Sequence, residues 1–160
     1  MKSYWQLFWT FVKVSAFTIG GGMAMISVVR DILVVHPIES AWGAKAVVAD
    51  RKAFNAPVID LRNVLMANHL DFDYGDEDHL ARFAKVTGKG AKALFQVGVA
   101  KYRVVVLPKM LTIRGTTLKL LQEFAKAGGQ VLYVEKAPAY LDAEKSTALA
   151  KVFQAFAKTT

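Results

Sequence analysis

The sequence contains no cysteine among its 160 residues. Disulfide bridges, thiolate metal ligands and cysteine nucleophiles are therefore excluded. The absence of cysteine is compatible with a reducing compartment, so we expect a cytoplasmic location, with membrane association through the N-terminal segment as the alternative. The chain also lacks internal repeats and low-complexity segments, which leaves an ordinary globular domain with a real core as the expectation.

Complete catalytic motifs are missing as well. The frames G-x-S-x-G and G-x-x-x-x-G-K-[ST] do not occur, so neither a nucleophile elbow nor a phosphate loop is predicted. Ser40, His36 and Glu39 lie too close together in the chain for a triad built on a rigid elbow. We predict no catalytic residue, no cofactor and no metal, and therefore no catalytic activity for this chain alone.

The net charge of +8 is the one compositional feature that could indicate an anionic partner. The lysines, however, are scattered singly, and no stripe of Lys or Arg alternates with aromatic residues. We therefore interpret the charge as a solvated basic surface and predict no nucleic-acid partner.

Residues 101–135 indicate a strand, a helix and a second strand. The apolar, β-branched run 102–107 ends at Pro108 and is typical of a parallel strand covered on both faces. Apolar residues recur at helical spacing within 114–127, and Gly128-Gly129 is a helix stop. A second apolar strand is expected at 130–135. The pattern predicts a right-handed βαβ unit and hence an α/β fold.

The remaining elements are expected from shorter signals. They are a strand at 32–35 ended by Pro37, a loop at 38–43, a helix at 58–69 started by Pro57, a strand end at 70–72, a turn at 87–90, a strand at 94–97 and a closing helix at 143–158. The apolar side of helix 58–69 is assigned to Ile59, Leu61, Val64 and Leu65, and that of helix 143–158 to Leu149, Val152, Phe153 and Phe156.

The acidic run 71–78 (DFDYGDED) is the sharpest polar feature. Its D-x-D-x-G spacing is similar to a calcium loop, but the glutamate at the twelfth position is missing. We favour a structural interpretation in which Asp76 caps a short helix, Glu77 and Asp78 lie in its first turn, and Leu80 and Phe83 point inward.

The candidate ligand-binding residues follow from strand ends. In doubly wound sheets, ligands bind outside the carboxyl ends of the strands. His36, Glu39 and Trp42 follow the strand 32–35 and are the candidates that this rule gives. The alternatives are a hydrogen-bonded loop histidine at position 36 and a core-covering tryptophan at position 42.

Residues 4–29 form an apolar stretch whose single charge is Lys13. It is long enough to cross a bilayer, but Lys13 and Gly20-Gly21-Gly22 argue against a simple span. The runs LFWTFVK (7–13) and AFTIGGGMAMI (16–26) resemble the N-terminus of chromate transporters. That resemblance implies membrane association, although a single helix cannot enclose a polar pathway. The alternative is an apolar helix that packs on the globular part.

A second resemblance covers residues 31–142. It is carried by HPIESAW (36–42), ANHLDFDYGDED (67–78), VGVAKYRVVVLPKMLTI (97–113) and FAKAGGQVLYVE (124–135). These residues are similar to the flavodoxin-like, glutamine amidotransferase-like domain of large glycoside hydrolases, called the trimerisation domain in β-galactosidases.

The second resemblance implies a flavodoxin-like parallel sheet with helices on both faces, preceded by an apolar N-terminal helix. The predicted domains are residues 1–30 and 31–160. In the glycoside hydrolases, bond cleavage takes place in a separate barrel of ~250 residues, for which this chain is too short. The resemblance therefore implies a non-catalytic structural or interaction domain related to carbohydrate metabolism. In such enzymes the domain sometimes shapes the sugar pocket or the oligomer, and the candidate ligand-binding residues for that role are His36, Glu39, Asp71 and Asp73. Its implied partner is a glycoside hydrolase barrel domain or further copies of the chain. A carbohydrate-acting hydrolase is the weakest alternative.

Overall fold

The structure is a computed structural model that describes residues 29–47 and 51–159. The predicted N-terminal apolar helix lies outside these residues, apart from the last two positions of domain 1–30. Within the described ranges, no helix combines the length and the apolar character that crossing a membrane requires. Strand β1 begins at Val29 and so extends across the predicted boundary between residues 30 and 31.

The described elements alternate between strands and helices. In chain order they are β1 (Val29–His36), α2 (Ile38–Val47), α3 (Arg51–Ala67), β2 (Phe72–Asp76), α4 (Glu77–Phe83), β3 (Ala84–Thr87), the 3₁₀ helix η1 (Gly90–Lys92), β4 (Leu94–Val97), β5 (Ala100–Leu107), β6 (Thr112–Ile113), α5 (Gly115–Lys126), β7 (Gln130–Val134), β8 (Tyr140–Leu141), β9 (Glu144–Lys145), α6 (Ala148–Phe153) and β10 (Ala157–Thr159).

The main sheet has the strand order β10-β7-β5-β1-β2, and every neighbouring pair along this path is parallel. Strand β1 lies between β5 and β2, with Val34 paired to Val106 of β5 on one side and to Tyr74 of β2 on the other. Strands β3 and β4 form an antiparallel extension that pairs with the first residues of β5. Strands β6, β8 and β9 make a small second sheet. The α/β fold class is therefore confirmed.

The predicted βαβ unit is present as β5, α5 and β7. Val105 of β5 pairs in parallel with Val131 of β7. Helix α5 ends as expected, because Gly128 adopts a φ of +97° that side chains disfavour. A Cβ atom on Gly129 would lie 2.1 Å from the ring of Phe124, so a side chain at this position would clash with that ring.

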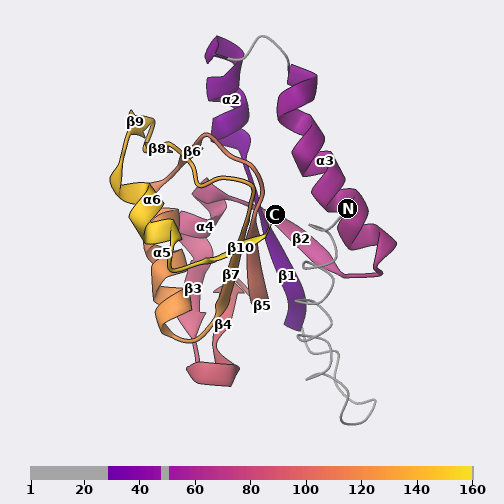
Figure 1. The fold of residues 1–160 in the computed structure, drawn as a ribbon. Coiled ribbons are helices and arrows are strands. Elements are labelled where there is room, and N and C mark those ends of the chain that lie inside the picture. Colours follow the sequence, from indigo (N-terminus) through magenta and orange to yellow (C-terminus); the bar gives the residue numbers. More distant parts are fainter. Residues whose placement is uncertain (1–28, 48–50, 160) are drawn as a thin grey trace.

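Two apolar clusters cover opposite faces of the sheet. Along β1, Leu33 and Val35 belong to the cluster that includes residues of α4, α5 and α6, whereas Ile32 and Val34 belong to the cluster that includes α3. This alternation is the period of two that strands impose on their side chains. Figure 1 shows α5 and α6 on one side of the sheet and α3 on the other.

The predicted loop at 38–43 is wrong, because these residues form the first part of α2. Pro37 ends β1 as expected, but its carbonyl oxygen also accepts the first helical hydrogen bond, from Ala41 N at 2.9 Å. Proline is compatible with the start of a helix, where its missing N–H has no partner to lose. The segment lacks a clear apolar stripe, so its periodicity gave no helical signal.

Helix α3 begins at Arg51, so the prediction that Pro57 starts it is wrong. Pro57 lies inside the helix, and the chain leaves the helix through His69, whose φ is +53°. Leu61 and Leu65 are buried as expected, but Ile59 is 45% exposed. Ile59 therefore does not belong to the buried side of α3.

Strand β2 and helix α4 divide the acidic run between them. The strand covers 72–76 rather than ending at residue 72. Asp76 caps α4 as predicted, since its Oδ1 accepts a hydrogen bond from His79 N at 2.9 Å. Leu80 is fully buried, but Phe83 is 51% exposed, so the inward orientation expected for Phe83 is wrong.

The closing helix predicted over 143–158 is much shorter in the structure. Asp142 and Ala143 both have positive φ, at 50° and 67°, and form the two-residue turn between β8 and β9. Helix α6 covers only 148–153, and the chain then enters β10 beside β7. Leu149, Phe153 and Phe156 are buried as expected, but Phe156 lies beyond the end of the helix.

Candidate functional site

The candidate site lies where β1 and β5 end. Strand β1 continues through Pro37 into α2 and α3, and α3 covers one face of the sheet. Strand β5 continues through Pro108 into α5, which covers the opposite face. Two adjacent parallel strands whose connections diverge in this way leave a crevice at their carboxyl ends, where α/β proteins bind ligands.

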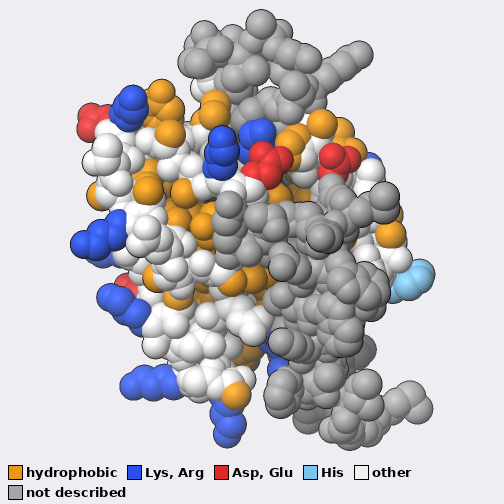
Figure 2. All heavy atoms as spheres, viewed as in Figure 1, with side chains coloured by type: hydrophobic (Ala, Val, Ile, Leu, Met, Phe, Trp, Pro, Cys, Tyr) orange, Lys and Arg blue, Asp and Glu red, His pale blue; other side chains and the backbone are white. Residues whose placement is uncertain are grey.

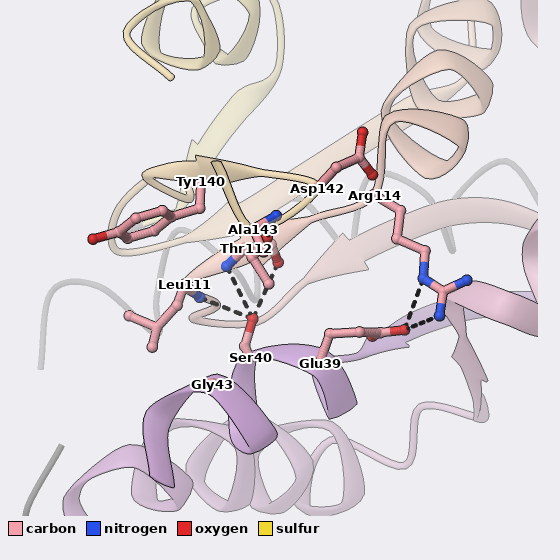
Figure 3. Close-up of a pocket in the computed structure, with 9 residues that line it drawn as sticks. All are labelled: Glu39, Ser40, Gly43, Leu111, Thr112, Arg114, Tyr140, Asp142 and Ala143. Atoms are coloured by element: carbon pink, nitrogen blue, oxygen red, sulfur yellow. Dashed lines mark hydrogen bonds and ion pairs between the residues drawn. The ribbon is translucent and has the colours of Figure 1, made fainter. Parts of the chain in front are cut away.

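A cleft of about 750 Å³ occupies this position, within the size range of small-molecule sites. Its walls come from α2, from the segment between β5 and α5, and from the β8–β9 hairpin (Figure 3). The lining residues are Glu39, Ser40, Gly43, Leu111, Thr112, Arg114, Tyr140, Asp142 and Ala143.

Ser40 joins two walls of the cleft. Its buried hydroxyl oxygen accepts hydrogen bonds from Leu111 N at 3.0 Å and Thr112 N at 3.1 Å, and its hydroxyl donates to Thr112 O at 3.1 Å. In Figure 3 the side chain of Ser40 points from α2 into the turn formed by residues 111–112. All three contacts are with backbone, so the role of this serine is to hold α2 against the segment that follows β5.

Arg114 is the cation of the cleft among the described lining residues. Its Nε and Nη2 atoms lie 2.9 and 2.7 Å from Glu39 Oε1, and its Nη1 lies 3.5 Å from Asp78 Oδ1. Burial alone would lower the pKa of Arg114, but the neighbouring Glu39 carboxylate raises it above the ordinary value. The second oxygen of Glu39, Oε2, is buried and has no hydrogen-bond partner among the described residues.

Glu77 holds the backbone of Arg114 in place through a partly buried hydrogen bond. It is 0% exposed, and its Oε2 accepts a hydrogen bond from Arg114 N at 2.8 Å, just before α5 begins. Burial raises the pKa of Glu77, while the N–H of Arg114 opposes the rise. Glu77 lies in the first turn of α4, as the acidic run predicted. The structure also buries it as a link between α4 and α5.

The β8–β9 hairpin is held against the cleft by two hydrogen bonds between a side chain and a backbone N–H. Asp142 Oδ1 accepts a hydrogen bond from Gly115 N at 3.0 Å, and Thr112 Oγ1 accepts one from Ala143 N at 3.1 Å. A Cβ atom at position 115 would lie 2.8 Å from Asp142 Oδ2, so glycine permits this approach. Figure 3 shows Tyr140 at one end of the cleft and the Glu39–Arg114 pair at the other.

The structure brings only part of the predicted site together. Glu39 lines the cleft, and Trp42 lies on the same helix but is 64% exposed and is not among the lining residues. The core-covering role considered for Trp42 is therefore wrong. His36 stands at the end of β1, where its ring contacts that of Tyr74 edge-on with centroids 5.5 Å apart, and its Nδ1 is buried without a partner among the described residues.

Asp71 and Asp73 lie away from the cleft. Asp71 precedes β2 and so stands at the amino end of that strand, whereas the cleft is at the carboxyl end of the sheet. Asp73 pairs with Leu33 in the middle of β1 and accepts a hydrogen bond from Tyr102 Oη at 2.8 Å. No group of three or more acidic or histidine side chains within the described ranges could hold a metal ion.

Several lining residues carried no signal in the sequence. Arg114, Tyr140 and Asp142 come from segments that lie far from Glu39 in the chain, and none of them belongs to a motif. A correct assignment of 38–43 as helix would have placed Glu39, Ser40 and Gly43 on one helical side. The hairpin turn at 142–143 has no Gly or Asn to mark it, so its contribution could not be anticipated.

Comparison with known proteins gives one family match. The model of the chromate transporter family matches residues 5–47, about a quarter of the chain. The match bears out the resemblance noted for the N-terminal segment. It also extends over β1 and α2, which the structure places in the α/β fold. No curated protein and no solved structure matches the chain, and no match links the chain to glycoside hydrolases.

Proposed function

We propose that the α/β part of the chain is a non-catalytic binding or interaction module whose ligand site is the cleft at the ends of β1 and β5. The observation that carries this proposal is the position of the cleft at the point where the connections of two central parallel strands diverge. Ser40, the one hydroxyl nucleophile on α2 within the cleft, has its oxygen engaged by three backbone groups. This arrangement supports a structural role for Ser40.

The strand order supports the flavodoxin-like interpretation of the fold. Counted along the chain without the antiparallel extension, the five parallel strands have the order 2-1-3-4-5, which is that of flavodoxin-like sheets. Together with the resemblance of residues 31–142, this order favours a domain of the glycoside-hydrolase type. The proposed ligand is accordingly a carbohydrate, and the proposed partner is a sugar-cleaving barrel or a further copy of the chain.

Carbohydrate binding can be measured directly on the intact chain. We expect a monosaccharide panel to shift amide resonances of residues 39–43 and 111–114, and Tyr140→Ala to weaken binding because it removes an aromatic platform from the cleft wall. Tyr74→Ala is the matched control, since Tyr74 is similarly exposed and lies on β2. Binding that both variants weaken equally, or that neither weakens, would contradict this location.

The non-catalytic part of the proposal has its own test. We expect the intact chain to leave chromogenic glycosides uncleaved. Hydrolysis that is lost in Asp76→Asn would instead support the hydrolase alternative, although Asp76 is engaged as the cap of α4. Because Asn is also a good capping residue, the substitution removes the charge with little effect on the helix.

A second candidate function is membrane association through the N-terminal segment. The match to the chromate transporter family supports this alternative more directly than any match supports the carbohydrate link. The test is flotation of the intact chain with liposomes, compared with Ile19→Lys. If the apolar stretch inserts, a second lysine at its centre costs about 2.5–3.5 kcal/mol, and the variant should remain in the aqueous fraction. Equal behaviour of both chains in the aqueous fraction would exclude insertion.

A further inference from the structure

We propose that the cleft prefers ligands that carry an ammonium group on a ring-sized body over neutral or anionic ligands of the same shape. This inference concerns the charge of the ligand and rests on the proposed function only in its location. It follows from the unequal numbers of carboxyl and guanidinium groups around the cleft and from one carboxylate oxygen that has no partner.

The charges around the cleft are unbalanced. Arg114 is the cation among the described lining residues, while Glu39 and Asp142 line the same cleft. Behind Arg114, Asp78 lies 3.5 Å from its Nη1, and Glu77 accepts its backbone N–H. Arg82 pairs with the other oxygen of Asp78, so with Glu77 uncharged three carboxylates face two guanidinium groups and leave an excess of one negative charge. The local field therefore opposes the net charge of +8 of the whole chain and repels anions from this site.

Glu39 supplies the specific contact. Its Oε1 is engaged by Arg114, but Oε2 is buried without a partner among the described residues. This buried oxygen lacks a donor, and rotation of the Glu39 carboxylate toward the cleft would let a ligand supply one. A charged donor forms the stronger hydrogen bond. Arg114 cannot supply a comparable contact to an anion, because Glu39 and Asp78 already occupy its guanidinium.

The opposite end of the cleft suits the body of such a ligand. Tyr140 lies there, separated from the Glu39–Arg114 pair along the cleft (Figure 3), and Leu111 and Ala143 add apolar wall. An aromatic ring binds the apolar face of a sugar or another ring by stacking. The cleft thus has an apolar end and an acidic end, which is the complement of an amphipathic cation.

The experiment compares ligands that differ only in charge. Glucosamine, glucose and glucuronate share one ring, and 2-phenylethylamine and 2-phenylethanol share another. Binding to the intact chain is measured by titration calorimetry at about pH 6.5, where the amines are protonated. We expect each amine to bind at least about tenfold more tightly than its neutral counterpart, and glucuronate to bind least.

Two variants connect the preference to the site. Glu39→Gln removes the acceptor charge and frees Arg114, so it should abolish the preference for amines and improve glucuronate binding. Asp142→Asn lowers the negative charge while Oδ1 can still accept the Gly115 N–H, so it should reduce the preference without reversing it. Glu123→Gln, the same change on the exposed side of α5, is the control and should behave as the unchanged chain.

Each outcome has a defined meaning. Equal binding of glucosamine and glucose, or a preference that survives Glu39→Gln in a folded protein, overturns the charge inference and leaves the carbohydrate proposal intact. Binding of 2-phenylethylamine without any sugar supports the charge inference and overturns the carbohydrate proposal. If none of the five compounds binds, both are overturned.

Discussion

At the scale of single residues, Ser40 is a short side chain that connects α2 to the segment after β5. One hydroxyl group satisfies two N–H groups and one carbonyl group of the segment that follows β5, and it does so at a fully buried position. An unsatisfied buried polar group costs about 1–3 kcal/mol. The stability of the cleft therefore depends on this side chain, independently of what the cleft binds.

We predict that Ser40→Ala lowers the free energy of unfolding by about 2–3 kcal/mol, because the N–H groups of Leu111 and Thr112 lose their buried acceptor. The measurement is urea denaturation followed by circular dichroism. Thr116→Ala, at an exposed position of α5, is the control and should change the free energy by less than about 0.5 kcal/mol. Equal values for both variants would contradict the arrangement of Ser40.

Glu77 gives a prediction with a defined pH dependence. Burial raises its pKa in the folded state above the ordinary value, so the folded chain binds this proton more tightly than the unfolded chain. The stabilising contribution is therefore complete below the ordinary glutamate range and is lost as pH rises through the raised pKa. Unfolding free energies measured from about pH 4 to pH 8 should fall for the unchanged chain relative to Glu77→Gln.

The comparison with Glu77→Gln isolates this one group, because Gln can still accept the Arg114 N–H through its carbonyl oxygen. Glu123→Gln, which removes an exposed carboxylate from α5, should give a curve parallel to that of the unchanged chain. Parallel curves for all three proteins would show that Glu77 ionises in the folded state as it does in the unfolded state.

At the scale of elements, local signals predicted some segments well and failed for others for identifiable reasons. The β5–α5–β7 unit was predicted because β-branched runs and the Gly128-Gly129 stop are local features of the chain. Helix α2 was missed because its residues have no helical apolar stripe and because Pro37 was interpreted only as the end of a strand. The β8–β9 turn was missed because Asp142 and Ala143 adopt positive φ without glycine.

The cleft could be predicted only in part for a related reason. Its general position follows from the rule for strand ends, and Glu39 was found by that rule. Arg114, Tyr140 and Asp142 join it through tertiary contacts between segments that are distant in the chain, and such contacts leave no spacing to detect. Asp71 lies outside the cleft, because β2 starts at Phe72 and Asp71 therefore stands at the opposite end of that strand.

Pro57 gives an element-scale prediction that separates the two interpretations of α3. If the helix begins at Arg51, the proline lies inside it and lacks an N–H for the preceding turn. Pro57→Ala should then raise the free energy of unfolding by about 1–3 kcal/mol and increase the helical circular dichroism signal. If the helix begins after Pro57, as the sequence alone suggested, the same substitution would leave stability unchanged or lower it.

Ala56 provides the matched variant for this test. Ala56→Gly should cost about 0.5–1 kcal/mol if position 56 is helical, because glycine loses more backbone entropy there than alanine. A helix that starts after Pro57 would make this substitution nearly neutral. If α3 begins at Arg51, Pro57→Ala raises the free energy of unfolding and Ala56→Gly lowers it. If α3 begins after Pro57, neither substitution raises this free energy.

At the scale of the whole molecule, the N-terminal family match overlaps the sheet: the family is a membrane transporter, but some of the matched residues form a strand. The chromate transporter match includes residues 29–36, yet these residues form the inner strand β1, which is paired on both sides. The match continues into helix α2, so all of its described residues, 29–47, belong to the α/β fold. Any membrane role must therefore be compatible with a strand that begins immediately after the apolar stretch.

Hydrogen exchange tests this consequence on the intact chain. Because β1 pairs with β5 on one side and β2 on the other, its amides should exchange only by global unfolding, together with those of β5, while amides of the edge strand β2 exchange faster. Val34→Ala, at a fully buried position of β1, should lower the protection of β1 and β5 by the same amount, about 2 kcal/mol. Val99→Ala, at a position that is 80% exposed, should leave both unchanged. If β1 were instead a continuation of a membrane segment, its protection would depend on lipid and would change independently of β5.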